Sequence, residues 1–162
     1  MGHRLKKLLL NKRANSDTDN FIEDEFIKCE DEVSYFNSSI LTSSEDKSLY
    51  EMINKKAIRL LYKLTRDGFT KSEFRSKSDG IENTITIVLN NLNYVYGGYA
   101  SKAWHSNDEY IEDENAFFFS LRRNGTSTNV KYKVTDPQKP YFDISPTVAD
   151  GLITEIEVFQ LE

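Results

Sequence analysis

The chain has 162 residues, of which 38% are hydrophobic and 29% charged, which is typical of one globular domain rather than a disordered segment. Its formal net charge of −5 argues against attraction of the whole surface to nucleic acid. A single cysteine, Cys29, excludes an internal disulfide and a cysteine-based zinc site within one chain, and it fits a reducing, cytoplasmic compartment.

Residues 1–37 differ from the rest of the chain by their segregated charges. The stretch RLKKLLLNKR is basic and EDEFIKCEDE is acidic. Neither this segment nor any later one holds the ~20 apolar residues of a transmembrane helix. We interpret residues 1–37 as a charged, flexible leader, and expect the folded domain to occupy residues 38–162.

The folded region is predicted to open with a helix. Thr42 and Glu45 have the spacing of a capping box, as do Ser43 and Asp46, although aspartate is the weaker second partner. Three apolar residues then share one helical face: Leu49, Met52 and Ile53. The alternating stretch AIRLLYKL predicts a strand. Its buried face would carry Ile58, Leu60, Tyr62 and Leu64.

A turn and a second helix are expected in TRDGFTKSEFRSKSDG. The first DG is a turn signal, and Thr70 with Glu73 again has capping-box spacing. Phe69 and Phe74 occupy the positions of a hydrophobic staple. Together these signals predict a helix over residues 71–77 that ends at the second DG.

The remainder of the chain is rich in short strands. TITIVLN and YVYGGY, joined by NNLN, predict a hairpin whose first strand buries Ile85, Ile87 and Leu89. NAFFFSL is apolar on both faces, which is typical of a central strand covered on both sides. In NVKYKV we expect Lys131 and Lys133 to face solvent. The opposite face would carry Val130, Tyr132 and Val134.

The order of these elements predicts the fold class. All three prolines lie in DPQKPYFDISPTVADG, which we interpret as an irregular surface loop before the closing strand ITEIEVFQL. A helix, a strand and a helix, followed by strands without intervening helices, predict an α+β fold with a mostly antiparallel sheet, or two such sheets packed as a sandwich.

Two adjacent glycines, Gly97 and Gly98, lie inside a predicted strand, where glycine is unfavourable. They match neither the dinucleotide-binding fingerprint nor a P-loop, because both motifs need spaced glycines that open a helix. We therefore expect a backbone kink or bulge packed under aromatic rings.

The sequence shows no convincing catalytic set, and no cofactor is expected. Five acidic residues follow His105: Asp108, Glu109, Glu112, Asp113 and Glu114. Their spacing matches no calcium loop, so we interpret a solvated acidic loop, with a metal-dependent hydrolase as an alternative. Glu155 and Glu157 form a carboxylate pair that we assign to the wet face of a strand. Arg66 and Asp67 are expected to form a buried ion pair at the turn.

Four segments, taken in order, resemble the TLDc domain: LLYKLTRDGFTKSEFRSKSDG, TITIVLNNLNYVYGGYASKAW, ENAFFFSL and TEIEVF. With SSILTSSEDKSLYEMI they cover residues 38–162. The resemblance implies a β-sandwich of mostly antiparallel strands flanked by a few short helices. Scaffold positions are expected at Gly68, Phe69, Gly97, Gly98, Tyr99, Asn115, Phe117, Phe119, Glu155 and Glu157. Binding contacts are expected at Arg66, Asp67, Trp104 and His105.

The resemblance also implies a non-catalytic binding and regulatory module. TLDc proteins are associated with protection against oxidative damage, and several bind the vacuolar-type proton-pumping ATPase (V-ATPase) and regulate its assembly or activity. A cytoplasmic location, peripheral to vacuolar or endolysosomal membranes through a partner, is therefore expected. With only Cys29, Met1 and Met52 as sulfur-bearing residues, the chain would protect indirectly rather than by scavenging oxidants.

The chain departs from the family pattern near its C-terminal end. A glycine-rich segment of the GGGxD type usually precedes the last strands, whereas here PYFDISPTVADG runs directly into LITEIEVF. We interpret the domain as shortened in this region, and do not carry over binding that depends on that segment. A second hypothesis is an adaptor that recruits partners through residues 1–37.

Overall fold

A computed structural model describes residues 33–105, 111–133 and 151–162 of the chain. Two segments lie outside the described parts: the leader up to residue 32 and the proline-containing loop. So do the side chain of Lys133 and three residues named above, Val134, Asp108 and Glu109. The predictions made for them therefore stay predictions.

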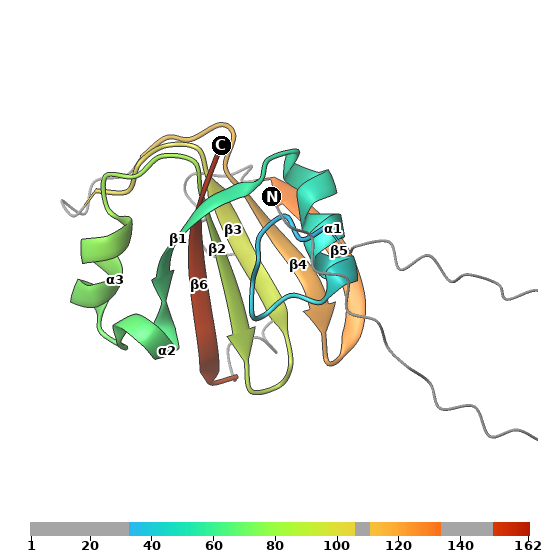
Figure 1. The fold of residues 1–162 in the computed structure, drawn as a ribbon. Coiled ribbons are helices and arrows are strands. Elements are labelled where there is room, and N and C mark those ends of the chain that lie inside the picture. The colour runs from blue at the N-terminus through green and yellow to red at the C-terminus, as the bar shows by residue number, and fades with distance from the viewer. Residues whose placement is uncertain (1–32, 106–110, 134–150) are drawn as a thin grey trace, which may run out of the picture. The chain divides into compact units, whose positions relative to one another are not determined.

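Six strands form one sheet with the order β1-β6-β2-β3-β4-β5 (Figure 1). They are β1 (Ala57–Lys63), β2 (Thr84–Asn90), β3 (Val95–Ala100), β4 (Phe117–Arg123), β5 (Thr126–Lys133) and β6 (Ile153–Leu161). Every neighbouring pair is antiparallel, including the predicted β2–β3 hairpin, which confirms the α+β class. All named strands in the described ranges belong to this sheet, so the second sheet of the expected sandwich is not among them.

Three short helices accompany the sheet: α1 (Ser43–Ile53), α2 (Leu64–Asp67) and α3 (Lys71–Ser78). Both predicted capping boxes are confirmed, with Thr42 and Glu45 starting α1, and Thr70 and Glu73 starting α3. Helix α3 ends at Ser78 with Asp79 as its C-cap, close to the predicted end, whereas α2 was not foreseen as a helix. No helix in the described ranges is long and apolar enough to cross a membrane.

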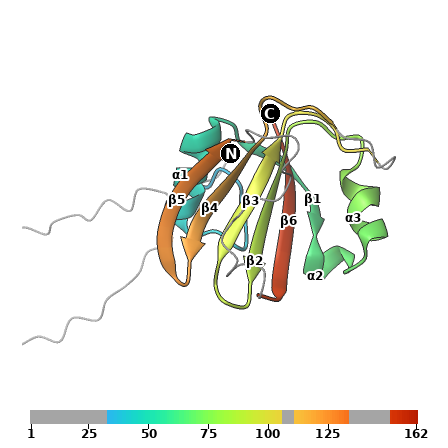
Figure 2. The ribbon, with the colours of Figure 1, turned by 180° about the vertical axis from the view of Figure 1, so that it is seen from behind.

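The main hydrophobic core lies between one face of the sheet and the segment that leads into and includes α1. Figure 1 shows this segment in front of the sheet, and Figure 2 shows the sheet in front of α1. Phe36 and Leu49 from this segment pack with Ile85, Ile87 and Phe119 of the sheet. Because Phe36 is only 2% exposed, packed structure begins before residue 38. A smaller cluster joins Leu61, Tyr62, Leu64 and Val158.

The adjacent glycines of β3 provide space for aromatic rings. A Cβ atom on Gly97 would lie 1.9 Å from the carbonyl oxygen of Thr86 and 2.6 Å from the ring of Phe119. A Cβ atom on Gly98 would lie 3.2 Å from the ring of Phe118. Packing under aromatic rings is therefore confirmed. The expected kink or bulge is wrong for the β2–β3 ladder, whose register has no shift.

The simple alternation expected for β1 is wrong. Ile58 is 59% exposed, whereas Leu61 is buried. The pairing of β1 with β6 shifts register twice, between Ala57 and Arg59 and again between Leu60 and Tyr62. Each shift changes which side chains face the core, so a strict period of two cannot hold along this strand.

The prediction for β5 is confirmed for Lys131, which is exposed, and wrong for Val130 and Tyr132. Val130 is 38% exposed and Tyr132 is 42% exposed. Although exposed, Lys131 is paired with buried Phe119, and its Nζ contacts the ring of Phe117 and donates to a backbone carbonyl of α1. A lysine can cover this edge of the core because its stem is apolar and its ammonium reaches polar groups.

Strand β4 is internal, between β3 and β5, as predicted, but the expected coverage of both its faces is not met. Phe117 and Phe119 are buried, but Phe118, on the other face, is only partly buried. Strand β4 is next to the edge strand β5, and α1 lies over the face that carries Phe117 and Phe119. A run of phenylalanines therefore indicates a buried strand without fixing how many of its faces are covered.

Candidate functional site

The candidate site centres on residues 64–78, which we call the helical corner: α2, the turn after it and α3. Arg66 Nη2 lies 2.6 Å from Asp67 Oδ2, and Asp67 also accepts a hydrogen bond of 2.8 Å from the backbone N–H of Lys63. The pKa of Asp67 is lowered to about 2, mainly by the hydrogen bond from Arg66 and further by the bond from the Lys63 N–H. The predicted ion pair exists, but it is not buried, because the Arg66 side chain is 48% exposed; Asp67 holds α2 against β1.

The turn that follows is fixed on both sides of Phe69. Gly68 has a φ of 112°, and its carbonyl accepts a hydrogen bond of 2.6 Å from the hydroxyl of Tyr62. On the other side, the backbone N–H of Thr70 donates to Glu73 at 2.9 Å. This position favours glycine for its conformation, and a Cβ atom there would also displace the Glu73 carboxylate, which would lie 2.2 Å away.

Phe69 itself is 74% exposed, so the predicted hydrophobic staple with Phe74 is wrong. Phe74 already packs between two other rings, with centroid distances of 5.2 Å to Tyr62 and 5.4 Å to Trp104. The helix start is therefore secured by the capping box and these contacts, while Phe69 remains at the surface.

Trp104 belongs to the packing of α3. Besides its contact with Phe74, its backbone pairs with Asp79, and its carbonyl accepts a hydrogen bond of 2.8 Å from Gly80. Tyr62, Phe74 and Trp104 thus form a continuous aromatic row between β1 and the segment after β3. This row links the turn to Trp104 and to its neighbour His105, the two other residues predicted to make binding contacts.

His105 is exposed and lines an open cleft of about 720 Å³. The cleft is also lined by Gly80, Ile81, Glu82, Lys102, Ala103, Ile111 and Gln160. No group of three or more histidine, cysteine or acidic side chains within the described ranges is arranged to hold a metal ion. Among the described residues, the cleft brings His105 together with one carboxylate, Glu82, and is not lined by Glu112, Asp113 or Glu114.

Asp113, from that acidic run, has a structural role. Its carboxylate accepts hydrogen bonds from the backbone and hydroxyl of Ser101 at 2.7 and 2.6 Å, and from the backbone N–H groups of Lys102 and Asn115. Burial alone would raise the pKa of Asp113, but these hydrogen bonds outweigh it and lower the pKa. Asp113 therefore ties the end of β3 to the start of β4, and Asn115 belongs to the same scaffold.

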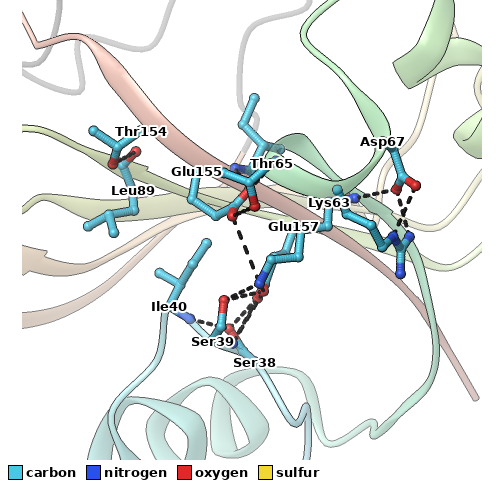
Figure 3. Close-up of polar contacts among 12 residues, drawn as sticks. Ser38, Ser39, Ile40, Lys63, Thr65, Asp67, Leu89, Thr154, Glu155 and Glu157 are labelled. Atoms are coloured by element: carbon cyan, nitrogen blue, oxygen red, sulfur yellow. Dashed lines mark hydrogen bonds and ion pairs between the residues drawn. The ribbon is translucent and has the colours of Figure 1, made fainter.

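Glu155 and Glu157 belong to a buried charged cluster, whose polar contacts Figure 3 shows. They are 9% and 1% exposed, so their assignment to a wet strand face is wrong. Glu157 accepts hydrogen bonds from the hydroxyls of Ser38 and Ser39 at 2.5 and 2.7 Å, and from Lys63 Nζ at 2.9 Å. These bonds overcome the effect of burial, which alone would raise the pKa of Glu157, and lower that pKa.

This buried cluster contains the residue types of a catalytic site but is arranged as an anchor. Lys63 donates to Ser39 Oγ as well as to Glu157, and Ser39 in turn donates to Glu157. A serine activated by lysine needs a neutral amine as its base, whereas Lys63 is paired with carboxylates at 2.9 and 3.8 Å. The arrangement joins the chain before α1 to β1 and β6, which supports a structural role.

Two features of this region were not visible from the sequence. The burial of Glu157 depends on Lys63, which is 94 residues away in the chain, and only the β1–β6 register brings them together. Phe69 is exposed because its expected partner, Phe74, packs against the rings of Tyr62 and Trp104 instead. The other expected scaffold residues Tyr99, Phe117 and Phe119 lie in the core.

Comparison with known proteins gives one result. A family model described as the TLDc domain matches residues 34–152, about three quarters of the chain. The match includes the helical corner and strands β1 to β5, and it ends before β6, so TEIEVF lies beyond it. A search of curated proteins gave no match.

Proposed function

We propose that this chain, which belongs to the TLDc domain family, is a non-catalytic binding module and regulates a V-ATPase. In this proposal it contributes to protection against oxidative damage through that partner, from the cytoplasmic side of a vacuolar or endolysosomal membrane. The observation that carries the proposal is the family match over residues 34–152.

The geometry of the polar side chains supports binding over catalysis. Asp67, Asp113 and Glu157 each accept several hydrogen bonds from their own fold, and the pKa of each is lowered. A general base or acid works best when its pKa lies near the working pH, so lowered carboxyl pKa values are the opposite of what such a role needs. These groups stabilise the domain and leave its surface for contacts with a partner.

The proposal is tested by measuring binding of the full chain to purified V-ATPase, together with ATP-driven proton transport by the pump. We expect the chain to co-purify with the pump and to change its assembly or transport rate. A C29S variant should behave like the wild type if protection is indirect, because it removes the single cysteine.

The control is an unrelated folded protein with the same net charge, which should neither bind nor alter transport. If the chain, shown to be folded by circular dichroism, binds no pump subunit and leaves transport unchanged, the proposed partner is wrong.

A further inference from the structure

Phe69 is a large aromatic side chain that the fold holds in solvent. At 74% exposure, it shares with Leu152 the highest value among the large apolar side chains in the described ranges. An exposed phenylalanine forgoes the stabilisation that burial would give it within its own domain. Its neighbour Gly68 and the capping box after it nevertheless fix this position in one conformation.

The rigidity of the turn suits Phe69 to be an anchor for a partner. The carbonyl of Gly68 is held by Tyr62, a residue that is 1% exposed, and Thr70 is held by Glu73. A side chain on an already ordered backbone loses little conformational freedom on binding. Aromatic side chains are also enriched at the centres of protein interfaces.

The charge around Phe69 indicates the chemistry of that partner. Residues 66–77 carry four cations and two carboxylates, a net charge of +2 on a chain of −5. The cations are Arg66, Lys71, Arg75 and Lys77. Both carboxylates are engaged within the corner, Asp67 by Arg66 and Glu73 by Thr70.

Two of the cations are exposed and have no ion pair with a described residue. Lys71 and Lys77 are exposed, and neither forms a salt bridge with a residue in the described parts of the chain. Lys77 also lies close enough to Asp67 to help lower its pKa, which places it near the turn. An apolar anchor thus projects from a locally positive surface on an otherwise acidic protein.

We infer that the helical corner docks an acidic segment of a partner protein, with Phe69 packed against apolar side chains of that segment. The complementary charge of the partner would contact Lys71 and Lys77, and would steer its approach toward the corner. This inference rests on the proposed binding function and adds to it the docking surface and the chemical class of the partner.

The test uses the full ¹⁵N-labelled chain and a synthetic helical peptide that carries glutamates on one face and leucines on the other. We expect amide shift changes at residues 66–77 with this peptide and not with its glutamine counterpart. F69A and the double variant K71E/K77E should each weaken binding at least about tenfold, and F69W should restore it. Added salt should weaken wild-type binding more than that of K71E/K77E.

The matched controls are I58A, which removes another exposed apolar side chain, and K47E, which reverses an exposed lysine on α1. Both should bind within about twofold of wild type, because neither residue is in the corner. Each variant is checked by thermal melting, and we expect F69A to keep its fold because Phe69 is exposed.

Two results would overturn the inference: no shift changes at residues 66–77 with the acidic peptide, or F69A and K71E/K77E binding as tightly as wild type. Binding of wild type to the purified V-ATPase tests the proposed function separately. A chain that binds the peptide at the corner but not the pump would refute the partner and keep the docking surface. If all variants bind the pump as tightly as wild type, the docking surface is refuted and the V-ATPase partner is kept.

Discussion

Replacing Gly97 by alanine tests whether the glycine pair serves the packing of the sheet. The new Cβ atom would lie 1.9 Å from the carbonyl oxygen of Thr86, which belongs to the neighbouring strand and cannot rotate away. Overpacking typically costs ~1–3 kcal/mol, and a backbone obstacle places G97A at the upper end. The alanine gives back about 0.4–1 kcal/mol by restricting the unfolded chain. We therefore expect a net loss of about 2–3 kcal/mol.

The adjacent glycine supplies a matched control. In G98A the new atom would lie 3.2 Å from the ring of Phe118, a side chain that can shift by a few tenths of an ångström. We expect G98A to unfold within about 1 kcal/mol of wild type. The assay is urea unfolding followed by the fluorescence of Trp104, where 2–3 kcal/mol lowers the midpoint by about 1–2 M. Equal midpoints for G97A and G98A would refute the packing explanation.

Three further substitutions test other parts of the fold by urea unfolding. E157Q should destabilise by about 2 kcal/mol at pH 7, since it removes one charge of a mostly buried pair. The pKa of Glu157 is lowered from 4.5, so its contribution to stability is present above pH 4.5 and is lost as the pH falls further. The stability difference between E157Q and wild type should therefore shrink in acid, and a difference that grows would contradict this. T70A should cost about 1 kcal/mol through loss of the α3 capping box, and an unchanged midpoint would show that the cap is dispensable. K131M removes the cation 3.9 Å from the Phe117 ring and should cost no more than about 1 kcal/mol; a larger loss would indicate a wider role for Lys131.

The local signals for the helix starts and the hairpin were reliable, whereas the equally local staple between Phe69 and Phe74 was not, because tertiary contacts occupy Phe74. The two capping boxes and the β2–β3 hairpin are confirmed at their predicted positions, because each depends on residues within one turn or one hairpin. The faces of β1 and the apolar face of β5 were mispredicted, because bulges and neighbouring strands decide which side chains meet the core.

The candidate site shows the same division. The sequence indicated the RDGF turn and an ion pair between Arg66 and Asp67, and it indicated that Gly97 and Gly98 are packing positions. It gave no sign that Phe69 would be exposed, since its staple partner Phe74 is taken by rings from β1 and from the segment after β3.

The sequence by itself determined the α+β class, the helix starts, the hairpin and the resemblance to the TLDc domain. Only the tertiary structure decided that Glu157 is buried and that Phe69 is presented to solvent. The physical reason is separation along the chain. Capping and turn formation involve residues a few positions apart, whereas the pairing of Lys63 with Glu157 spans 94 residues and exists only once β1 and β6 have been brought into register.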